Sequence, residues 1–148
     1  DITIDTNIKG LLYVTRAILN LMTKRKSGHI VNIGSISGLQ TYPNGNVYSA
    51  TKHAVRALSD NMRIDLLPEH IKVTTINPGR VQTEFMEVMF KGDKKKVENI
   101  GHGFESLAAA DVAEAILFAV TRPSNVVIAE LTIVPKAQAD CNNLFKNN

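Results

Sequence analysis

The feature that most constrains this chain is a regular alternation of helical and strand patterns. Apolar residues recur at near-helical spacing over three stretches, residues 3–24, 46–67 and 108–121. A short, continuously apolar or β-branched run follows each of them, at residues 29–33, 72–77 and 126–134. Continuous apolar strands that alternate with helices favour a parallel sheet covered by helices on both faces. The predicted fold class is therefore α/β, a Rossmann-like doubly wound parallel sheet.

The boundaries of these elements also follow from the sequence. The first helix is apolar over more than half of its circumference, so we expect it to be buried on two sides. The second helix should stop before Pro68, because the residue before a proline disfavours helical backbone. Residues 79–105 have weak periodicity, and residues 137–148 form a polar tail that we expect to fray. Residues 1–136 are thus predicted to belong to a single domain.

Composition excludes several classes of protein. Of the 148 residues 44% are apolar and 21% are charged, which is ordinary for a globular protein. The net charge is +3, and the short basic cluster Lys94–Lys96 reads best as a solvated loop, so we predict no nucleic-acid partner. No apolar run reaches the length of a membrane span. The single cysteine, Cys141, excludes an internal disulfide and fits a reducing compartment, which predicts a cytoplasmic protein.

The predicted fold itself suggests where a ligand binds. In open parallel sheets, ligands lie beyond the carboxyl ends of the strands. Here those ends are Gly34–Ser37 and Pro78–Thr83, both rich in small and hydroxyl residues. The sequence therefore predicts a site where these two loops meet.

Tyr48 and Lys52 lie four residues apart on a predicted helix, so their side chains share one face. A phenol titrates near pH 10, and a nearby ammonium lowers its pKa, which would allow acid–base chemistry. By itself the pair could equally be surface residues of an amphipathic helix. Ser35 ends a strand thirteen residues before Tyr48. Its hydroxyl could bind a substrate carbonyl, or it could merely close the turn.

Three segments together resemble the short-chain dehydrogenase/reductase family: Val31–Gly38, Val47–Val55 and Asn77–Thr83. That family has a Ser, then Tyr-x-x-x-Lys, then Pro-Gly after the next strand. The resemblance runs from Asp5 to about Val134. Asn7 matches the family's fourth active-site residue, although an Asn near a helix start is common for structural reasons alone.

The resemblance implies catalytic roles for four residues. Tyr48 would be the general acid in carbonyl reduction and the base in alcohol oxidation. Lys52 would lower the pKa of Tyr48 and bind the nicotinamide ribose, and Ser35 would polarise the substrate carbonyl. Asn7 would support the proton relay through a bound water. The hydride itself belongs to the cofactor.

The resemblance also implies the surroundings of the cofactor and substrate. The residues expected around the nicotinamide, besides Tyr48 and Lys52, are Pro78, Gly79, Val81 and Thr83. Ser35, Tyr42 and Glu84 are predicted to contact the substrate, and the same pocket could include Asn44, Phe85, Met86 and Met89. Two nearby residues are not predicted to be catalytic. Ser37 lacks the family's spacing to Tyr48, and His53 points about 100° away from Lys52 around the helix. We predict no metal site.

The glycine-rich dinucleotide fingerprint that should follow a first strand is absent. Gly101-His102-Gly103 begins such a pattern, but residue 106 is Ser and no predicted strand comes before it. The residues that select the cofactor would then precede Asp1, and residues 29–33 would form a buried strand without its neighbour. We therefore expect this chain to be the C-terminal part of a longer dehydrogenase. The cofactor is predicted to be NADP or NAD, with NADP favoured by likeness to bacterial serine and 3-hydroxy acid dehydrogenases.

Three functions remain open at this point. The first is an NAD(P)-dependent oxidoreductase acting on a small alcohol or carbonyl. The second is a truncated, non-catalytic fragment or scaffold that cannot hold the cofactor. The third is a sugar-nucleotide epimerase, which the short stretch after Lys52 disfavours. In the resembling family, helices matching residues 3–24 and 46–67 pack against their copies, which implies a homodimer or homotetramer.

Overall fold

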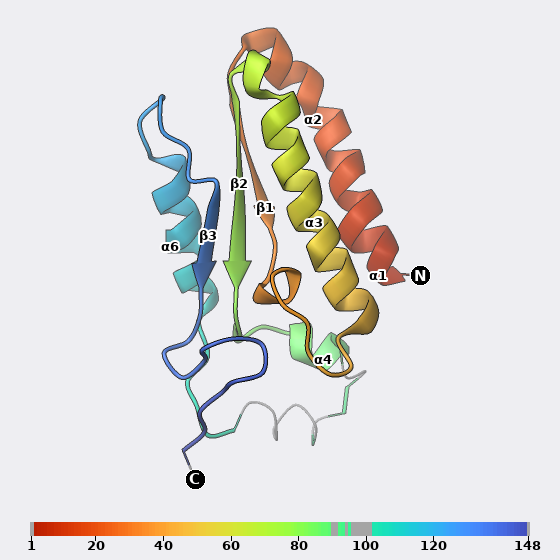
Figure 1. Cartoon of the computed structure of the whole chain (residues 1–148), viewed down its shortest axis with the longest axis vertical. Coiled ribbons are helices and arrows are strands. Elements are labelled where there is room, and N and C mark those ends of the chain that lie inside the picture. Colours follow the sequence, from red (N-terminus) through yellow and green to blue (C-terminus); the bar gives the residue numbers. More distant parts are fainter. Residues whose placement is uncertain (1, 90–91, 94, 96–101, 148) are drawn as a thin grey trace.

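Three parallel strands form the centre of the molecule, β1 (Gly28–Ile33), β2 (Ile71–Pro78) and β3 (Glu130–Ile133). The computed structural model describes residues 2–89, 92–93, 95 and 102–147. The strand order is β1-β2-β3, with Gly28 opposite Ile71 and Thr75 opposite Glu130. All three strands therefore point the same way, and their carboxyl ends lie at one edge of the sheet (Figure 1).

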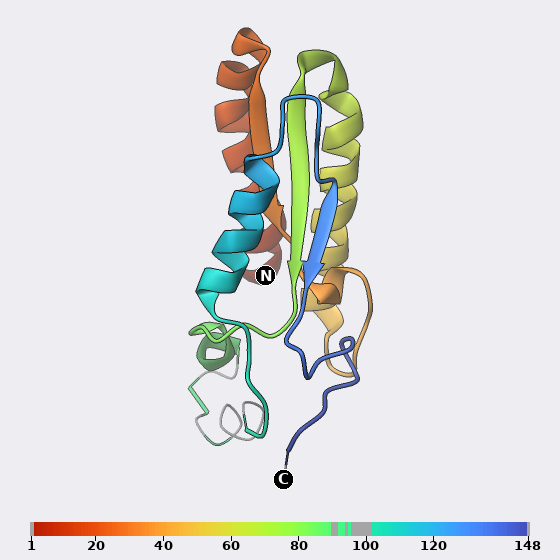
Figure 2. The same ribbon diagram turned by 90° about the vertical axis from the view of Figure 1, so that its left-hand side faces the viewer.

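Helices cover both faces of this sheet (Figure 2). On one face α2 (Leu11–Arg25) and α3 (Asn46–Asp65) enclose a core of Ile30, Leu66, Ile71 and Val73. On the other face α6 (Ala109–Val120) packs its buried alanines on Ile76. The neighbouring β1 residues Ile30 and Val31 belong to opposite cores, as the alternation of side chains along a strand requires. The predicted fold class, an α/β doubly wound parallel sheet, is confirmed.

The first predicted helix is not continuous. It consists of α1 (Ile2–Ile4), a π-helical segment η1 (Asp5–Gly10) and α2. A π-helical turn widens the backbone hydrogen-bond ring by one residue, and such turns are frequent at functional sites. Residue spacing alone does not reveal an insertion of this kind. The interruption includes Asn7, one of the predicted site residues.

Two other boundaries differ from the prediction. Helix α3 ends at Asp65, and Pro68 lies in a following 3-10 turn, η3 (Leu67–Glu69). Strand β3 pairs only from Glu130 onward. The apolar residues before it are instead fixed by side chains of β2: the Lys72 ammonium donates to the Val126 carbonyl, and the Thr74 hydroxyl donates to the Ile128 carbonyl.

Helix α2 is buried on one side only, so the prediction of burial on two sides is wrong for this structure. Its other side exposes Tyr13, Val14 and Leu21. Helix α3 also exposes an apolar side chain, that of Ile64. None of the helices in the described ranges is long and apolar enough to cross a membrane.

The C-terminal segment, predicted to fray, is instead folded back onto the domain. Gln138 is buried, and its amide oxygen accepts the Arg80 backbone N–H at 2.9 Å. Residues Gln138 and Leu144 form an isolated antiparallel bridge. The prediction failed because single polar residues that become buried leave no periodic signal in the sequence. Lys94, Lys96 and Gly101, which entered the sequence predictions, lie outside the described residues, as does the side chain of Met89.

Candidate active site

The predicted site residues gather at the edge of the sheet where the strands end. The loop after β1 carries Ser35, and β2 ends at Pro78. The first two turns of α3 bring Tyr48 and Lys52 to the same edge, beside the 3-10 turn η2 (Ile36–Gly38) (Figure 1). Residues distant in sequence are thus brought together by the parallel sheet.

The loop after β1 is held by a dense set of hydrogen bonds. The Gly34 N–H donates to the Ile76 carbonyl at 2.7 Å, and the Ser35 N–H donates to Asn77 Oδ1 at 3.2 Å. The Ser35 hydroxyl oxygen accepts the Ser37 N–H at 3.1 Å. The hydroxyl keeps its own O–H donor, and it also makes a side-chain hydrogen bond with Tyr48. All five residues from Gly34 to Gly38 are buried.

Glycine is required at position 38 for close packing against α3. A Cβ atom there would lie 2.6 Å from the Lys52 carbonyl oxygen. Backbone atoms cannot rotate away as a side chain can, so any larger residue would displace the helix or the loop. This contact fixes the distance between the loop that carries Ser35 and the helix that carries Lys52.

Tyr48 and Lys52 are neighbours, as their spacing predicted. The Lys52 ammonium lies 5.9 Å from the centre of the Tyr48 ring and donates to the Ile33 carbonyl at 2.9 Å. The Tyr48 ring in turn meets the Phe85 ring, with centroids 5.3 Å apart. Tyr48 thus lies between the cation of its own helix and an aromatic residue of the segment after β2.

Burial dominates the titration of both groups. It raises the pKa of the Tyr48 phenol above its ordinary value, and a hydrogen bond with Ser35 acts in the opposite direction. Burial also lowers the pKa of Lys52. Desolvation disfavours the charged form of each group. Lys52 is not among the groups that shift the Tyr48 pKa here, so the lowering of that pKa by Lys52 stays a prediction.

Asn7 reaches the site through α3. Its side-chain amide donates to Thr51 Oγ1 at 3.0 Å, and that hydroxyl donates to the Tyr48 carbonyl at 2.8 Å. Thr51 is almost fully buried, so these two bonds fix the first turns of α3 to η1. Asn7 therefore lies next to the Tyr48–Lys52 segment, and Thr51, which the sequence prediction missed, is the connection.

The Pro78–Thr83 segment continues from β2 and is fixed from the C-terminal side. The Gly79 N–H donates to the Ile133 carbonyl at 2.7 Å. Val81 forms a parallel bridge with Leu107, through hydrogen bonds made by the residues on either side of Val81. No residue of the described chain bonds to the amide group of Val81 itself. Thr83 is exposed, and its hydroxyl accepts the Phe85 N–H.

The predicted substrate-contacting residues fall into two groups. Tyr42 is half-buried beside the loop after β1. Burial raises its pKa, and a hydrogen bond with Ser37 opposes that effect. Glu84 is exposed next to α4 (Phe85–Met89). Tyr42 therefore lies with the buried part of the site, whereas Glu84 lies at its solvent side. Ser37, which was predicted not to be catalytic, donates its backbone N–H to the Ser35 hydroxyl.

The folded C-terminal segment adds residues that the sequence did not reveal. Cys141 donates its backbone N–H to the Gln40 side chain, and the Asn142 amide donates to the Thr41 carbonyl. Burial raises the pKa of the Cys141 thiol, which keeps it protonated and unreactive. Nothing in the sequence marked Gln138 as a residue of this region. Asn77 could have been found, because it is a polar residue at the end of an apolar strand. Within the described ranges no cluster of His, Cys, Asp or Glu could hold a metal ion.

Comparison with known proteins agrees with this geometry. Residues 1–94 match the family model described as short chain dehydrogenase. An NADP-dependent 3-hydroxy acid dehydrogenase of Escherichia coli is 47% identical over 92% of this chain. One of Schizosaccharomyces pombe is 39% identical over 97% of it. In both cases the match covers 55% of the relative, so the chain spans about half the length of these curated relatives.

Solved structures of dehydrogenases are also similar to this chain over most of its length. The closed form of a serine dehydrogenase complexed with NADP+ has a TM-score of 0.90 and 44% sequence identity. That match covers 98% of this chain and 59% of the other. A serine dehydrogenase from Escherichia coli has a TM-score of 0.75 and 41% identity, covering 92% of this chain and 53% of the other. The similarity thus includes both strand-end loops and the folded C-terminal segment.

Proposed function

Because this chain belongs to the short-chain dehydrogenase family, we propose that it carries the proton-handling part of an NADP-dependent oxidoreductase. The enzyme would interconvert an alcohol and a carbonyl. The main support is the convergence of Ser35, Tyr48 and Lys52 at the carboxyl edge of the sheet. In this proposal residues 1–136 correspond to the C-terminal portion of a dehydrogenase domain, and residues 137–148 to its tail. "The whole protein" below means this chain with any further residues that it has in the cell.

The donor groups of the site fit the nicotinamide end of NADP. Lys52 carries three donors, and only one is used, for the Ile33 carbonyl. The other two have no partner in the described part of the chain and suit the two ribose hydroxyls. The unused amide of Val81 suits the carboxamide, with Pro78, Gly79 and Thr83 nearby. NADP over NAD is supported by the names of the two curated relatives and by the serine dehydrogenase complex.

The residues of this chain would manage the proton, while the nicotinamide would carry the hydride. Ser35 would donate its O–H to the substrate carbonyl and hold it toward Tyr48. In reduction, Tyr48 would donate its phenolic proton to the developing alkoxide, and in oxidation its phenolate would take that proton back. Lys52 would stabilise the phenolate. Asn7 would keep α3 in place through Thr51 and support the relay that returns the proton.

We also propose a short hydroxy acid as the substrate. The support is that relatives with 39–47% identity are named 3-hydroxy acid dehydrogenases, and a solved relative is a serine dehydrogenase. Tyr42 and Phe85 would enclose the carbon chain beside Tyr48. Glu84 would line the solvent side of the pocket, where its charge would influence the approach of an acid.

The whole protein is proposed to be a cytoplasmic homodimer or homotetramer. Support for the assembly comes from the exposed apolar residues Tyr13, Val14 and Leu21 of α2 and Ile64 of α3. Larger exposed apolar patches mark protein–protein interfaces. Sedimentation of the whole protein as a monomer at micromolar concentration would contradict this part of the proposal.

The direct test is Tyr48→Phe in the whole protein. Loss of the phenol removes the proton donor, so kcat should fall by at least about 100-fold, the lower range for general acid–base catalysis. NADPH binding, followed by fluorescence titration, should be largely retained. The matched control is Tyr13→Phe, which removes the same hydroxyl from an exposed tyrosine of α2 and keeps its ring. Wild-type turnover by Tyr48→Phe would overturn the proposed function.

A further inference from the structure

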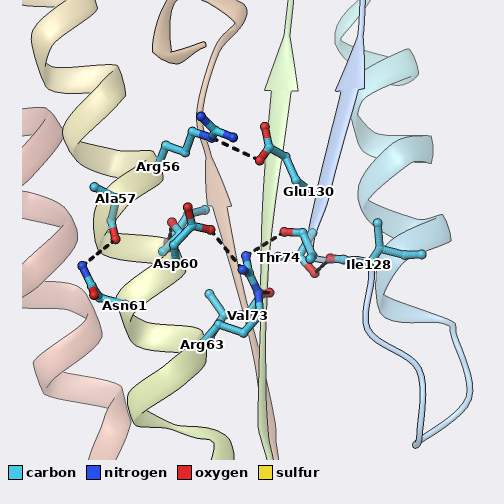
Figure 3. Close-up of polar contacts among 12 residues, drawn as sticks. Arg56, Ala57, Asp60, Asn61, Arg63, Val73, Thr74, Ile128 and Glu130 are labelled. Atoms are coloured by element: carbon cyan, nitrogen blue, oxygen red, sulfur yellow. Dashed lines mark hydrogen bonds and ion pairs between the residues drawn. The ribbon is translucent and has the colours of Figure 1, made fainter.

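A chain of polar contacts leads from the surface of α3 to the backbone of Ser35. The Arg56 guanidinium donates to Glu130 Oε2 at 3.2 Å, and this link between α3 and β3 is drawn in Figure 3. The other carboxylate oxygen, Glu130 Oε1, accepts from Asn77 Nδ2 at 2.7 Å. Asn77 Oδ1 then accepts the Ser35 N–H at 3.2 Å. Four separate segments of the fold are joined in this way.

Glu130 determines which way the Asn77 amide is turned. A carboxylate can only accept hydrogen bonds, so it must face the NH₂ group of the amide. The amide oxygen is then directed at the Ser35 N–H, which needs an acceptor. In the opposite orientation two donors would meet at Ser35 and two acceptors at Glu130. The charge of Glu130 therefore specifies the hydrogen bond that Ser35 makes.

Asn77 is tightly enclosed. Its side chain is fully buried, and it packs where a Cβ atom of residue 34 would lie, a position that is free only because residue 34 is Gly. Removing the Glu130 carboxylate would leave a buried NH₂ group without an acceptor, which is costly. The amide would then shift or rotate, and the Ser35 backbone would lose its acceptor.

We propose that Glu130 and Arg56 are positioning residues for Ser35, and that they act through Asn77. This inference rests on the proposed function, in which Ser35 holds the substrate carbonyl. Neither Glu130 nor Arg56 contacts the predicted reacting atoms. Glu130 orients the buried amide, and Arg56, which is half-exposed on α3, compensates the charge of the half-buried carboxylate. The precision of the catalytic loop thus depends on an ion pair in a different part of the fold.

A double-mutant cycle on the whole protein tests this inference. Glu130→Met keeps the length of the side chain but removes both acceptors. We expect kcat to fall about tenfold, which corresponds to about 1.4 kcal/mol of transition-state free energy, with the KM for NADPH unchanged. In a Ser35→Ala background the same substitution should change kcat less than about twofold, because coupled residues are not additive. A tenfold loss in both backgrounds would overturn the inference.

The pH dependence of turnover supplies a second readout, which a purely structural role would not affect. The hydrogen bond with Ser35 lowers the pKa of Tyr48. Displacing Ser35 should therefore raise that pKa, and the alkaline decline of the reduction rate should move to higher pH in Glu130→Met, as in Ser35→Ala. A lower melting temperature with an unmoved pH profile would mean that Glu130 is only structural.

The chain offers a matched control. Glu69 forms a carboxylate–ammonium pair with Lys26 at 2.6 Å, at the opposite end of the sheet, and its side chain is 31% exposed against 28% for Glu130. Glu69→Met should leave kcat and the pH profile unchanged. If Glu130→Met does not fold, Arg56→Met replaces it in the cycle, with an expected two- to threefold loss of kcat that Arg56→Lys restores.

Failure of this inference and failure of the proposed function give different results. If Ser35→Ala retains wild-type kcat, the role of Ser35 is wrong, and both proposals are overturned. If Ser35→Ala is inactive but the losses in the cycle are additive, the proposed function stands and only the positioning role is overturned.

Discussion

The two strand-end loops that form the candidate site differ in how they are held. In the loop after β1, the five residues Gly34–Gly38 are all buried, and the backbone is tied to β2 and to its own turn. In the segment after β2, residues 82–85 are all exposed and make few bonds beyond the bridge to Leu107. The predicted proton chemistry thus lies on the fixed loop and on helix α3 packed against it, whereas the predicted substrate contacts extend onto the looser segment.

This difference suggests a division of labour. Proton transfer requires hydroxyl groups at defined distances, which a buried and hydrogen-bonded loop can provide. Choice of substrate requires a surface that can vary without disturbing the sheet, and exposed segments tolerate change best. Phe85 connects the two, because its ring from the looser segment meets the Tyr48 ring.

The largest expected effect comes from disturbing the fixed loop with Gly38→Ala. The added Cβ would meet the Lys52 carbonyl at 2.6 Å, so loop and helix must separate. We expect the free energy of unfolding of the whole protein to fall by about 1–3 kcal/mol, as for other overpacked sites. Because Ser35 and Lys52 would be misaligned, kcat should fall at least about tenfold.

Thermal unfolding and steady-state kinetics measure these two effects. Gln82→Ala is the comparison in the looser segment, where the side chain is exposed and the melting temperature should not change. If both variants melt at the wild-type temperature, the two loops do not differ in the way the structure indicates.

A smaller effect is expected at the ring contact between the loops. Burial is the largest cause of the raised Tyr48 pKa, and Phe85→Ala would open the phenol to water. The pKa should then move down toward its ordinary value. Reduction needs the protonated phenol, so its rate should be lost at lower pH than in the wild type, whereas oxidation should gain at lower pH.

The pH profiles of kcat in both directions show this shift. Val88→Ala is the control, because Val88 is 74% exposed in the same short helix and has no ring to place on Tyr48. Profiles that coincide for wild type and Phe85→Ala would mean that the looser segment does not influence the proton chemistry.

What the sequence could predict differs between regular, local features and single long-range contacts. The sheet, its helices and the Ser35, Tyr48 and Lys52 positions follow from periodicity and spacing, because these are regular and local properties. Asn7 was found only by resemblance, and its actual contact, Thr51, was not found at all, since one buried hydroxyl has no distinctive pattern. The direction in which the Tyr48 pKa shifts could not be predicted, because it depends on burial by residues distant in sequence.

An intermediate effect on the fixed side is expected for Thr51→Val. Valine has the same shape but cannot accept from Asn7 or donate to the Tyr48 carbonyl, two bonds of 3.0 and 2.8 Å. The loss should be about 1 kcal/mol of unfolding free energy, as for a typical buried hydrogen bond. A fall in kcat of about three- to fivefold should accompany it as α3 loosens. Thr51→Ser keeps the hydroxyl and should restore most of both, and a Thr51→Ser protein as impaired as Thr51→Val would assign the effect to packing instead.

The smallest predicted effect belongs to Glu84, on the exposed side of the looser segment. If the substrate is a hydroxy acid, its carboxylate and Glu84 repel each other, and Glu84→Gln should lower the KM for the acid. Between exposed charges this effect is about twofold and should fade as salt is added. A neutral alcohol of the same size should show no change. Glu87→Gln, at an exposed residue of the adjacent helix α4, is the comparison for a general charge effect. Equal changes for the acid and the neutral alcohol would show that Glu84 does not sense the charge of the substrate.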